Sequence, residues 1–401
     1  MDMLRRIVAG SVIALCGLSQ GIGQQYSQTN LVSNTPGAAP TVDSLLGNPW
    51  GLSRGPGNTW WMSNLNSATA TMYSDSGVKQ PLSIAVLPPG NPNDPQSFDG
   101  PAGILANDNP NDFLLTNNKP AEFLFSSIGG KIIGWNSSVG LSAGDTPPST
   151  HAVVMVNNAD GSAYSGMTKA TVGGRTYLYL ANFTMHRIDV YDNAFHPVDI
   201  QNVPGASVPS GGSSATNAPF VDDQLPTGYS PFNIQVVGND LVVTYALLPP
   251  GSFVETDGPG NGYVDVYSSS GTLKRRLEHG NWMNAPWGIA LAPANFGAFD
   301  GKLLVAQFAG AGSTQSSGLI AAFDWETGKF DGFLQGTTAQ PVSISGVFAI
   351  KAVEVDPSET TPAQPCQARL YFTSGPNGGA GGLLGYLAPL PISTLCGATS
   401  Y

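Results

Sequence analysis

Short hydrophobic runs, separated by polar and turn-forming residues, recur along the chain in one repeated order. Each repeat opens with a small or aromatic residue, then Gly or a substitute, then an aliphatic residue. The six openings are NPWGLS (48–53), GPAGIL (100–105), YSGMTK (164–169), SPFNIQ (230–235), APWGIA (285–290) and SGVFAI (345–350). Self-similarity with a period of roughly 50–65 residues is typical of repeat architectures.

Further hydrophobic runs follow each opening, and their length and composition predict strands. The second runs are TWWMSNL (59–65), EFLFSS (122–127), TYLYLANF (176–183), DLVVTYAL (240–247), KLLVAQFA (302–309) and ARLYFTSG (368–375). The third runs are ATMYSDSG (70–77), GKIIGWNS (130–137), HRIDVYDN (186–193), GYVDVYSSSG (262–271), GLIAAFDWETG (318–328) and GGLLGYLAPL (381–390). Weaker fourth runs are PLSIAVL (81–87), HAVVMV (151–156), PVDI (197–200), TLKRRL (272–277) and KFDGFL (329–334).

The sixth repeat has no fourth run, whereas an unmatched strand, QTNLVS (28–33), precedes the first repeat. Pairing these two ends in one sheet would close a ring without open edges. The sequence therefore predicts an all-β, six-bladed β-propeller closed by its N-terminal strand. Two packed sandwich domains are the alternative, but they do not account for six similar openings. The second blade is the least regular, because DFLLT (112–116) predicts an extra strand.

The repeated Trp-Gly pairs, Trp50–Gly51 and Trp287–Gly288, have a structural explanation in a propeller. Opening strands line the central channel, where sheets converge and Gly admits close backbone approach. The composition agrees with this fold, since 50 Gly, 32 Pro and only 11% charged residues favour a turn-dense β protein. Disorder is disfavoured, because 41% of the residues are hydrophobic.

The N-terminal segment has the pattern of a secretory signal. Arg5 and Arg6 precede an apolar run over 7–18 that is too short to span a bilayer. We expect residues 1–23 to be a signal peptide, 24–401 to form one propeller domain, and the protein to be exported to a periplasmic or extracellular location. A lipoprotein site at Cys16 is a weaker alternative, because Leu15 is bulky. No later run is long and apolar enough to cross a membrane.

Charge and cysteine content limit the partners further. The net charge is −11 and there are no basic runs, which excludes a typical nucleic-acid-binding surface. Outside the signal segment the only cysteines are Cys366 and Cys396, and export would allow a disulfide between them. Two unpaired thiols are the alternative. We expect a monomer.

The sequence contains neither a His-Glu-x-x-His motif nor a phosphate loop, although the letters Gly-x-Ser-x-Gly occur at 17–21, 51–55 and 140–144. The segment DGPGNG (257–262) partly matches a calcium loop, but Pro259 replaces a ligand and the closing Glu is missing, so a tight turn is favoured. The four histidines lie in different repeats without ligand spacing.

Loops on a rigid scaffold often carry binding residues. The turn-rich segments 87–101 and 203–232 run directly into predicted channel-lining strands. The sequence therefore predicts a ligand-binding site at one channel mouth. Its candidate residues are Asn48, Trp50, Asp99, Asp222, Tyr229, Asn233, Asn284 and Trp287. The tryptophans could stack on a sugar, although packing in the core is the simpler interpretation.

A propeller channel can also assemble a metal site from one residue per blade, which no local motif would reveal. The oxygen ligands Glu122, Asp99, Asp222 and Asn233 would suit Ca²⁺ or Mg²⁺ if they converged. Capping and turn roles are the alternative for these side chains.

The segments TNLVSNTPGAA, GKIIGWN, LPTGYSPFNIQ, GPGNGYVDVY and APWGIALAPANFG resemble an uncharacterised family of exported bacterial proteins related to the NHL-repeat propellers. The resemblance covers the chain after the signal segment and implies the propeller and export, but no activity. More distant NHL-type relatives include sugar-lactone hydrolases and lyases that use a channel metal, and their ligand motifs are not recognisable here.

Two functional hypotheses follow. The first is a secreted binding scaffold that holds a small molecule, saccharide or peptide at the channel mouth. The second is a metal-dependent hydrolase or lyase, in which an ion such as Ca²⁺ polarises a substrate carbonyl.

Overall fold

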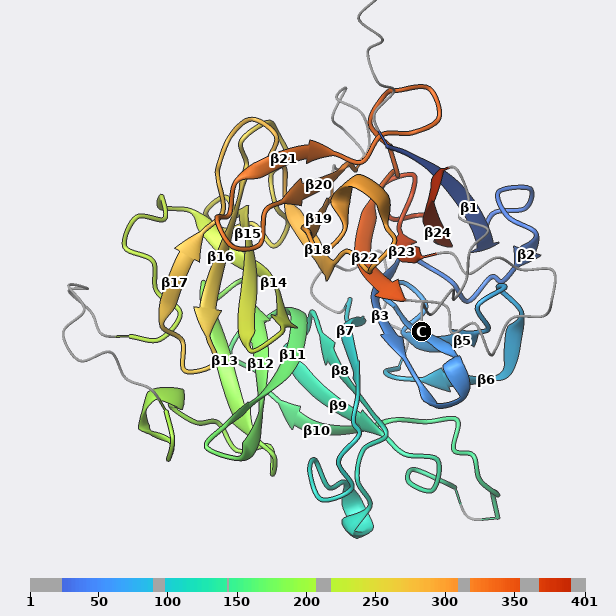
Figure 1. Cartoon of the computed structure of the whole chain (residues 1–401). Helices are drawn as coiled ribbons and strands as arrows, with labels where there is room; N and C mark the ends of the chain where they lie inside the picture. The colour runs from blue at the N-terminus through green and yellow to red at the C-terminus, as the bar shows by residue number, and fades with distance from the viewer. Residues whose placement is uncertain are drawn as a thin grey trace, which may run out of the picture.

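The computed structural model describes residues 24–88, 98–142, 144–206, 218–308, 318–353 and 368–390. Six sheets surround a common axis, and Figure 1 shows their inner strands forming a ring about it. The protein is therefore an all-β, six-bladed β-propeller, which confirms the fold predicted from the six repeats.

Blades 1 to 3 follow one another along the chain. From the channel outward, blade 1 consists of β3 (Pro49–Arg54), β4 (Trp60–Asn64), β5 (Thr69–Tyr73) and β6 (Lys79–Ala85). Blade 2 consists of β7 (Pro101–Ala106), β8 (Phe123–Ser127), β9 (Lys131–Trp135) and β10 (Val153–Asn157). Blade 3 consists of β11 (Tyr164–Val172), β12 (Arg175–Asn182) and β13 (Arg187–Asp192). Neighbouring strands within each blade are antiparallel.

Blades 4 to 6 complete the ring. Blade 4 consists of β14 (Tyr229–Val237), β15 (Asp240–Leu247), β16 (Gly262–Ser268) and β17 (Leu273–Arg276). Blade 5 consists of β18 (Pro286–Leu291), β19 (Leu303–Gln307), β20 (Ile320–Phe323) and β21 (Phe330–Phe333). Blade 6 consists of β22 (Val347–Val353), β23 (Arg369–Ser374), β24 (Leu383–Leu390) and β1 (Gln25–Ser33). Each inner strand contacts the inner strand of the next blade, and β22 contacts β3.

The N-terminal strand closes the ring, as predicted. β1 pairs antiparallel with β24, with Val32 opposite Leu384, and Figure 1 shows the blue and red strands side by side. The two-residue strand β2 (Thr41–Val42) then pairs in parallel with β1. Blade 6 is thus built from both ends of the described chain, which leaves no unpaired edge between blades 6 and 1.

The predicted fourth strand of blade 3, over 197–200, is wrong. Pro197 makes only an isolated bridge with Tyr191, because the chain turns away soon after Val198, whose N–H bonds the Val190 carbonyl at 2.9 Å. Ile200 then begins a short 3₁₀ helix, and the Asp199 side chain accepts a hydrogen bond from the Gln201 N–H at its start. The third sheet therefore has three strands.

The extra strand predicted over 112–116 is also wrong. Phe113 has a left-handed backbone conformation (φ 57°), and Thr116 begins another 3₁₀ turn. The Phe113 ring is fully buried and lies 5.7 Å from the Phe195 ring of blade 3. The apolar character of this segment therefore reflects a loop that packs blade 2 against blade 3.

Six hydrophobic clusters fill the spaces between neighbouring blades. Side-chain hydroxyls also join the blades. Ser63 of blade 1 accepts a 2.9 Å hydrogen bond from the Gly51 N–H and donates to the Ala102 carbonyl of blade 2. Close approach requires Gly at this edge, since a Cβ on Gly288 would lie 2.1 Å from the Phe348 carbonyl oxygen. In the described part of the chain, no helix has the length and hydropathy needed to cross a membrane.

Candidate functional site

The central channel contains a cavity of about 410 Å³. Residues from all six inner strands line it, mainly from the C-terminal halves of those strands. Val236 and Leu291, two of the lining residues, are each 37% exposed, and they mark the end at which the cavity opens. Its volume lies in the range usual for small-molecule sites.

Four aromatic rings close the other end of this channel cavity. Trp50, Phe232, Trp287 and Phe348 form this aromatic floor at the N-terminal ends of their inner strands. The Trp50 ring stacks on Phe348 at 4.3 Å between centroids, and it lies 6.1 Å from Phe232 and 6.2 Å from Trp287. The predicted stacking residues Trp50 and Trp287 therefore pack against each other. Of the two, only Trp287 also lines the cavity.

Asn233 is the other predicted site residue that lines the channel cavity. It is 2% exposed, and its Nδ2 donates a 2.8 Å hydrogen bond to the Trp287 carbonyl, which joins blade 4 to blade 5. Its Oδ1 occupies the space where a side chain on Gly166 would lie. Asn233 thus holds three inner strands together as well as facing the cavity.

Asn48 and Asn284 do not line this cavity; both have turn roles. Asn48 has a left-handed backbone conformation (φ 48°), which Asn tolerates better than most residues, and its N–H bonds the Gly381 carbonyl at 3.0 Å. The Oδ1 of Asn284 accepts a 2.8 Å hydrogen bond from the Gly258 N–H.

Asp99 and Glu122 are likewise engaged elsewhere in blade 2. Asp99 accepts a 2.8 Å hydrogen bond from the Gly129 N–H and forms an ion pair with Lys131. Glu122 accepts hydrogen bonds from the N–H and the hydroxyl of Ser137, at 3.2 and 2.8 Å. Both have capping roles of the kind that the sequence left open as the alternative to metal binding.

Asp222 and Tyr229 line a second cavity of about 500 Å³, between blades 3 and 4. His186, Phe220 and Tyr245 also line this second cavity. The structure therefore separates these two candidates from Asn233 and Trp287, with which the sequence grouped them.

A buried ionic network lies behind Asp222. The Arg276 guanidinium pairs both with Asp222 and with Asp265, the latter at 3.0 Å. Asp265 is completely buried, and burial raises its pKa to about 7 although Arg276 opposes the shift. Tyr267 donates to Asp265 at 3.3 Å and contacts the Tyr245 hydroxyl at 2.8 Å.

The candidate metal ligands do not form a set that fits a divalent ion. Asp99 and Glu122 belong to blade 2, Asp222 pairs with Arg276, and Asn233 lies in the channel among lysine and arginine residues. Among the described residues, no group of three or more His, Cys, Asp or Glu is arranged to hold a metal ion.

Among the residues that the structure describes, the charged ones that line the channel cavity are Arg54, Lys169 and Lys351, and no described carboxylate lines it. The sequence interpretation missed all three. A signal was present for two of them, because each follows the Gly of its opening by three positions: Gly51 precedes Arg54, and Gly166 precedes Lys169.

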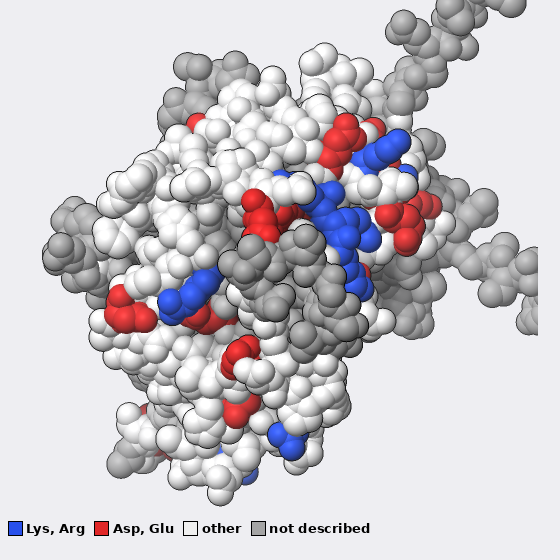
Figure 2. Space-filling view, turned by 90° about the vertical axis from the view of Figure 1, so that its left-hand side faces the viewer, with Lys and Arg blue, Asp and Glu red and all other residues white. Residues whose placement is uncertain are grey.

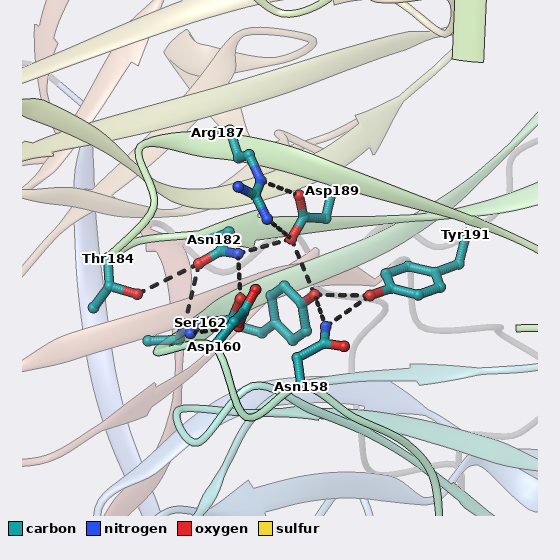
Figure 3. Close-up of polar contacts among 10 residues, drawn as sticks. Asn158, Asp160, Ser162, Asn182, Thr184, Arg187, Asp189 and Tyr191 are labelled. Atoms are coloured by element: carbon teal, nitrogen blue, oxygen red, sulfur yellow. Dashed lines mark hydrogen bonds and ion pairs between the residues drawn. The ribbon is translucent and has the colours of Figure 1, made fainter. Parts of the chain in front are cut away.

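A polar cluster in blade 3 resembles a functional site, but its polar groups are hydrogen-bonded to one another (Figure 3). Asn158 donates to the hydroxyls of Tyr164 and Tyr191 at 2.7 and 2.8 Å, and Tyr164 donates to Asp189 at 3.0 Å. Asn182 donates to the same Asp189 oxygen at 2.7 Å and is fully buried. Such a network stabilises the blade, because buried polar groups without partners would be costly.

Figure 2 shows the face of the molecule that lies on the left in Figure 1. Lys and Arg occur there in small groups with Asp or Glu beside most of them. The ion pairs of the structure, Lys274–Asp240 among them, show the same pairing of opposite charges. Outside the atoms drawn grey, this face has no broad basic surface of the kind that nucleic-acid-binding proteins present.

Two sequence predictions, the signal peptide and the disulfide, fall outside the described residues. They concern residues 1–23 and the two partners of the proposed disulfide, Cys366 and Cys396.

No family model matches the chain. It is similar to the uncharacterized protein R648 of Acanthamoeba polyphaga mimivirus, with 29% identity over 397 residues, covering 95% of this chain and 86% of that protein. Membership of an exported bacterial family, which the resemblance implies, therefore stays a prediction.

Two solved structures share a broad likeness with the chain. A Bacteroides thetaiotaomicron protein of unknown function has a TM-score of 0.49 and 10% identity, covering 91% of this chain and 76% of that one. The PQQ-bound aldose sugar dehydrogenase of Streptomyces coelicolor has a TM-score of 0.44 and 14% identity, covering 91% and 98%. At these values the likeness carries no information about activity.

Proposed function

We propose that the protein is a ligand-binding propeller that holds a small molecule in its channel cavity. The observation that carries the proposal is this cavity of about 410 Å³, which is open at one end, closed by the aromatic floor, and lined by all six blades. Rigid walls from six sheets suit a preformed site, in which binding costs little reorganisation.

The walls also indicate what kind of ligand fits. Aliphatic residues such as Leu52, Ile104, Met167 and Ile289 contribute to them, and polar atoms supply nearly as much of the lining as apolar atoms do. Several polar side chains in the lining are already engaged, since the Thr168 hydroxyl accepts a hydrogen bond from the Val236 N–H at 3.1 Å. A ligand would therefore be held both by apolar contacts and by the polar groups of the lining that are not already engaged.

The test uses 1-octanol as a neutral apolar probe, titrated calorimetrically into the purified protein. We expect one molecule to bind per chain. Leu291→Trp, placed at the open end, should weaken binding at least tenfold by filling the mouth. Leu114→Trp is the matched control, because Leu114 is similarly exposed (39%) but lies in a blade 2 loop away from the channel. Equal binding by both variants would contradict the proposal.

Export belongs to the same proposal and rests on the N-terminal pattern of residues 1–23. N-terminal sequencing of protein recovered outside the cytoplasm should then begin near Gln24. Retention of the first residues in the mature protein would overturn it.

The metal-dependent hydrolase stays an untested hypothesis, and no observation here favours it. It can be tested in the same preparations by measuring bound divalent ions and the melting temperature with and without a chelator. A stoichiometric ion whose removal lowers the melting temperature would support it against the ligand-binding proposal.

A further inference from the structure

We infer that the channel cavity selects an organic anion, a carboxylate or phosphate with an apolar body, and that Lys351 supplies the charge that meets the anionic group. This inference rests on the proposed function and deepens it. Three of the 16 Lys and Arg residues of an acidic protein line this one cavity, and no Asp or Glu in the described part of the chain lines it.

The three cations are not equally available. Arg54 is fixed by two hydrogen bonds to Asp75, at 2.7 and 2.9 Å, and its guanidinium lies 4.8 Å from the centre of the Trp60 ring. Trp60 itself donates to Asp75 at 2.7 Å. Arg54 therefore contributes a fixed positive field at the cavity wall and is poorly placed to turn toward a ligand.

Lys169 is held more loosely. It pairs with Asp108, whose side chain is 87% exposed, across the gap between blades 3 and 2. Exposed ion pairs contribute little, because water competes for both partners. The Lys169 ammonium can therefore leave Asp108 for an anion inside the cavity at small cost.

Lys351 is the one cation of the three that has no ion pair with a described carboxylate. It lies in β22 of blade 6, opposite Tyr371 of β23. Burial lowers its pKa, and the nearby charge of Arg54 lowers it further. A partly buried ammonium beside a second cation is stabilised by an added negative charge, so an anion at this wall would offset part of the cost of burying Lys351.

The rest of the lining argues for an apolar body on the same ligand. Leu52, Ile104, Met167, Ile289 and Ile350 contribute apolar surface to the lining, and Trp287 lies at its floor. A lysine ammonium is a point charge that does not discriminate between carboxylate and phosphate by geometry. The head group is therefore defined by its charge, and the binding experiment must distinguish the two chemistries.

The experiment compares three probes with the same tail: octanoate, octyl phosphate and 1-octanol. In the wild-type protein we expect at least one of the two anions to bind ten times more tightly than octanol, or better. Lys351→Met should bring the anions to within about threefold of octanol while octanol binding is unchanged. Lys351→Arg should retain most of the preference, because it keeps the charge.

Two controls make the result specific. Lys329→Met removes an exposed lysine that does not line the cavity, and it should leave all three affinities unchanged. Thermal unfolding of each variant shows whether it folds. If Lys351→Met does not fold, Lys351→Arg serves as the second variant.

The outcomes distinguish a failure of this inference from a failure of the proposed function. Tight octanoate binding alone identifies a carboxylate site, and tight octyl phosphate binding alone identifies a phosphate site. If octanol binds in the channel as well as both anions do, or if Lys351→Met leaves the preference intact, this inference falls while the proposed function stands. If none of the three probes binds, both fall.

Discussion

The indole Nε1 of Trp287 in blade 5 donates a 3.2 Å hydrogen bond to the carbonyl of Ser165 in blade 3. One side chain thus crosses the channel and joins two blades that are not neighbours in the ring. The bond is buried, and the same ring forms part of the aromatic floor beneath the channel cavity. Trp287 therefore decides both how deep the cavity is and how its floor is held.

Trp287→Phe tests this bond. The substitution keeps an aromatic ring but leaves the buried Ser165 carbonyl without its donor, so we expect the free energy of unfolding to fall by about 1–3 kcal/mol. Urea unfolding measures the change. Trp282→Phe is the control, because its Nε1 donates to the Glu278 carbonyl at an exposed site where water can replace it. Equal losses in the two variants would contradict the structural role given to Trp287.

Gly288→Ala tests the close approach of strands at the channel. The new Cβ would meet the Phe348 carbonyl oxygen at 2.1 Å, and we expect a loss of about 1–3 kcal/mol through overpacking. Gly336→Ala is the matched control, since its nearest neighbour would lie at 3.4 Å. Differential scanning calorimetry of both variants should show a lower melting temperature for Gly288→Ala alone.

Closure of the ring through β1 is tested by Val32→Asp. Val32 is fully buried opposite Leu384, so an aspartate there would be a buried, unpaired charge and should cost more than about 3 kcal/mol. Gln28→Asp lies on the exposed side of the same strand and should change stability by less than about 0.5 kcal/mol. If Val32→Asp were as stable as Gln28→Asp, β1 would not hold the ring closed.

The buried carboxyl of Asp265 predicts a pH dependence of stability. Its pKa is about 7 in the folded protein, whereas an unfolded aspartate titrates near its usual value of about 4. Between those values the folded state binds more protons than the unfolded state. The contribution of Asp265 to the free energy of unfolding is therefore complete below about pH 4 and is lost as the pH rises toward 7.

Asp265→Asn should remove this fall. We expect the difference in unfolding free energy between pH 5 and pH 8 to be about 2 kcal/mol smaller in the variant than in the wild type. Asp324→Asn is the control, because the hydrogen bond from Lys302 holds the pKa of Asp324 below its usual range, outside this window. An unchanged pH profile in Asp265→Asn would mean that Asp265 is ionised throughout.

The fold followed from the sequence because each blade repeats the same physical requirement. An inner strand at a crowded edge needs Gly or a small residue, as at Gly51 and Gly288, and the strands beside it need buried aliphatic faces. The predictions failed where apolar residues serve another purpose. Phe113 is buried in a loop, and Ile200 is buried in a short 3₁₀ helix.

The candidate site was predicted only in part. Trp287 and Asn233 do line the channel cavity, because their position in the repeat places them on inner strands. Asp99, Glu122 and Asp222 could not be placed from sequence, since their partners Lys131, Ser137 and Arg276 lie on separate strands or turns.

The sequence by itself determined the number of blades, the closing strand and the aromatic and glycine positions at the inner edge, because these follow from repetition and alternation along the chain. Only the tertiary structure decided which charges share a space. Arg54, Lys169 and Lys351 come from blades 1, 3 and 6, and they line one cavity because ring closure brings the ends of those inner strands together. Convergence of this kind depends on long-range packing, which no local pattern encodes.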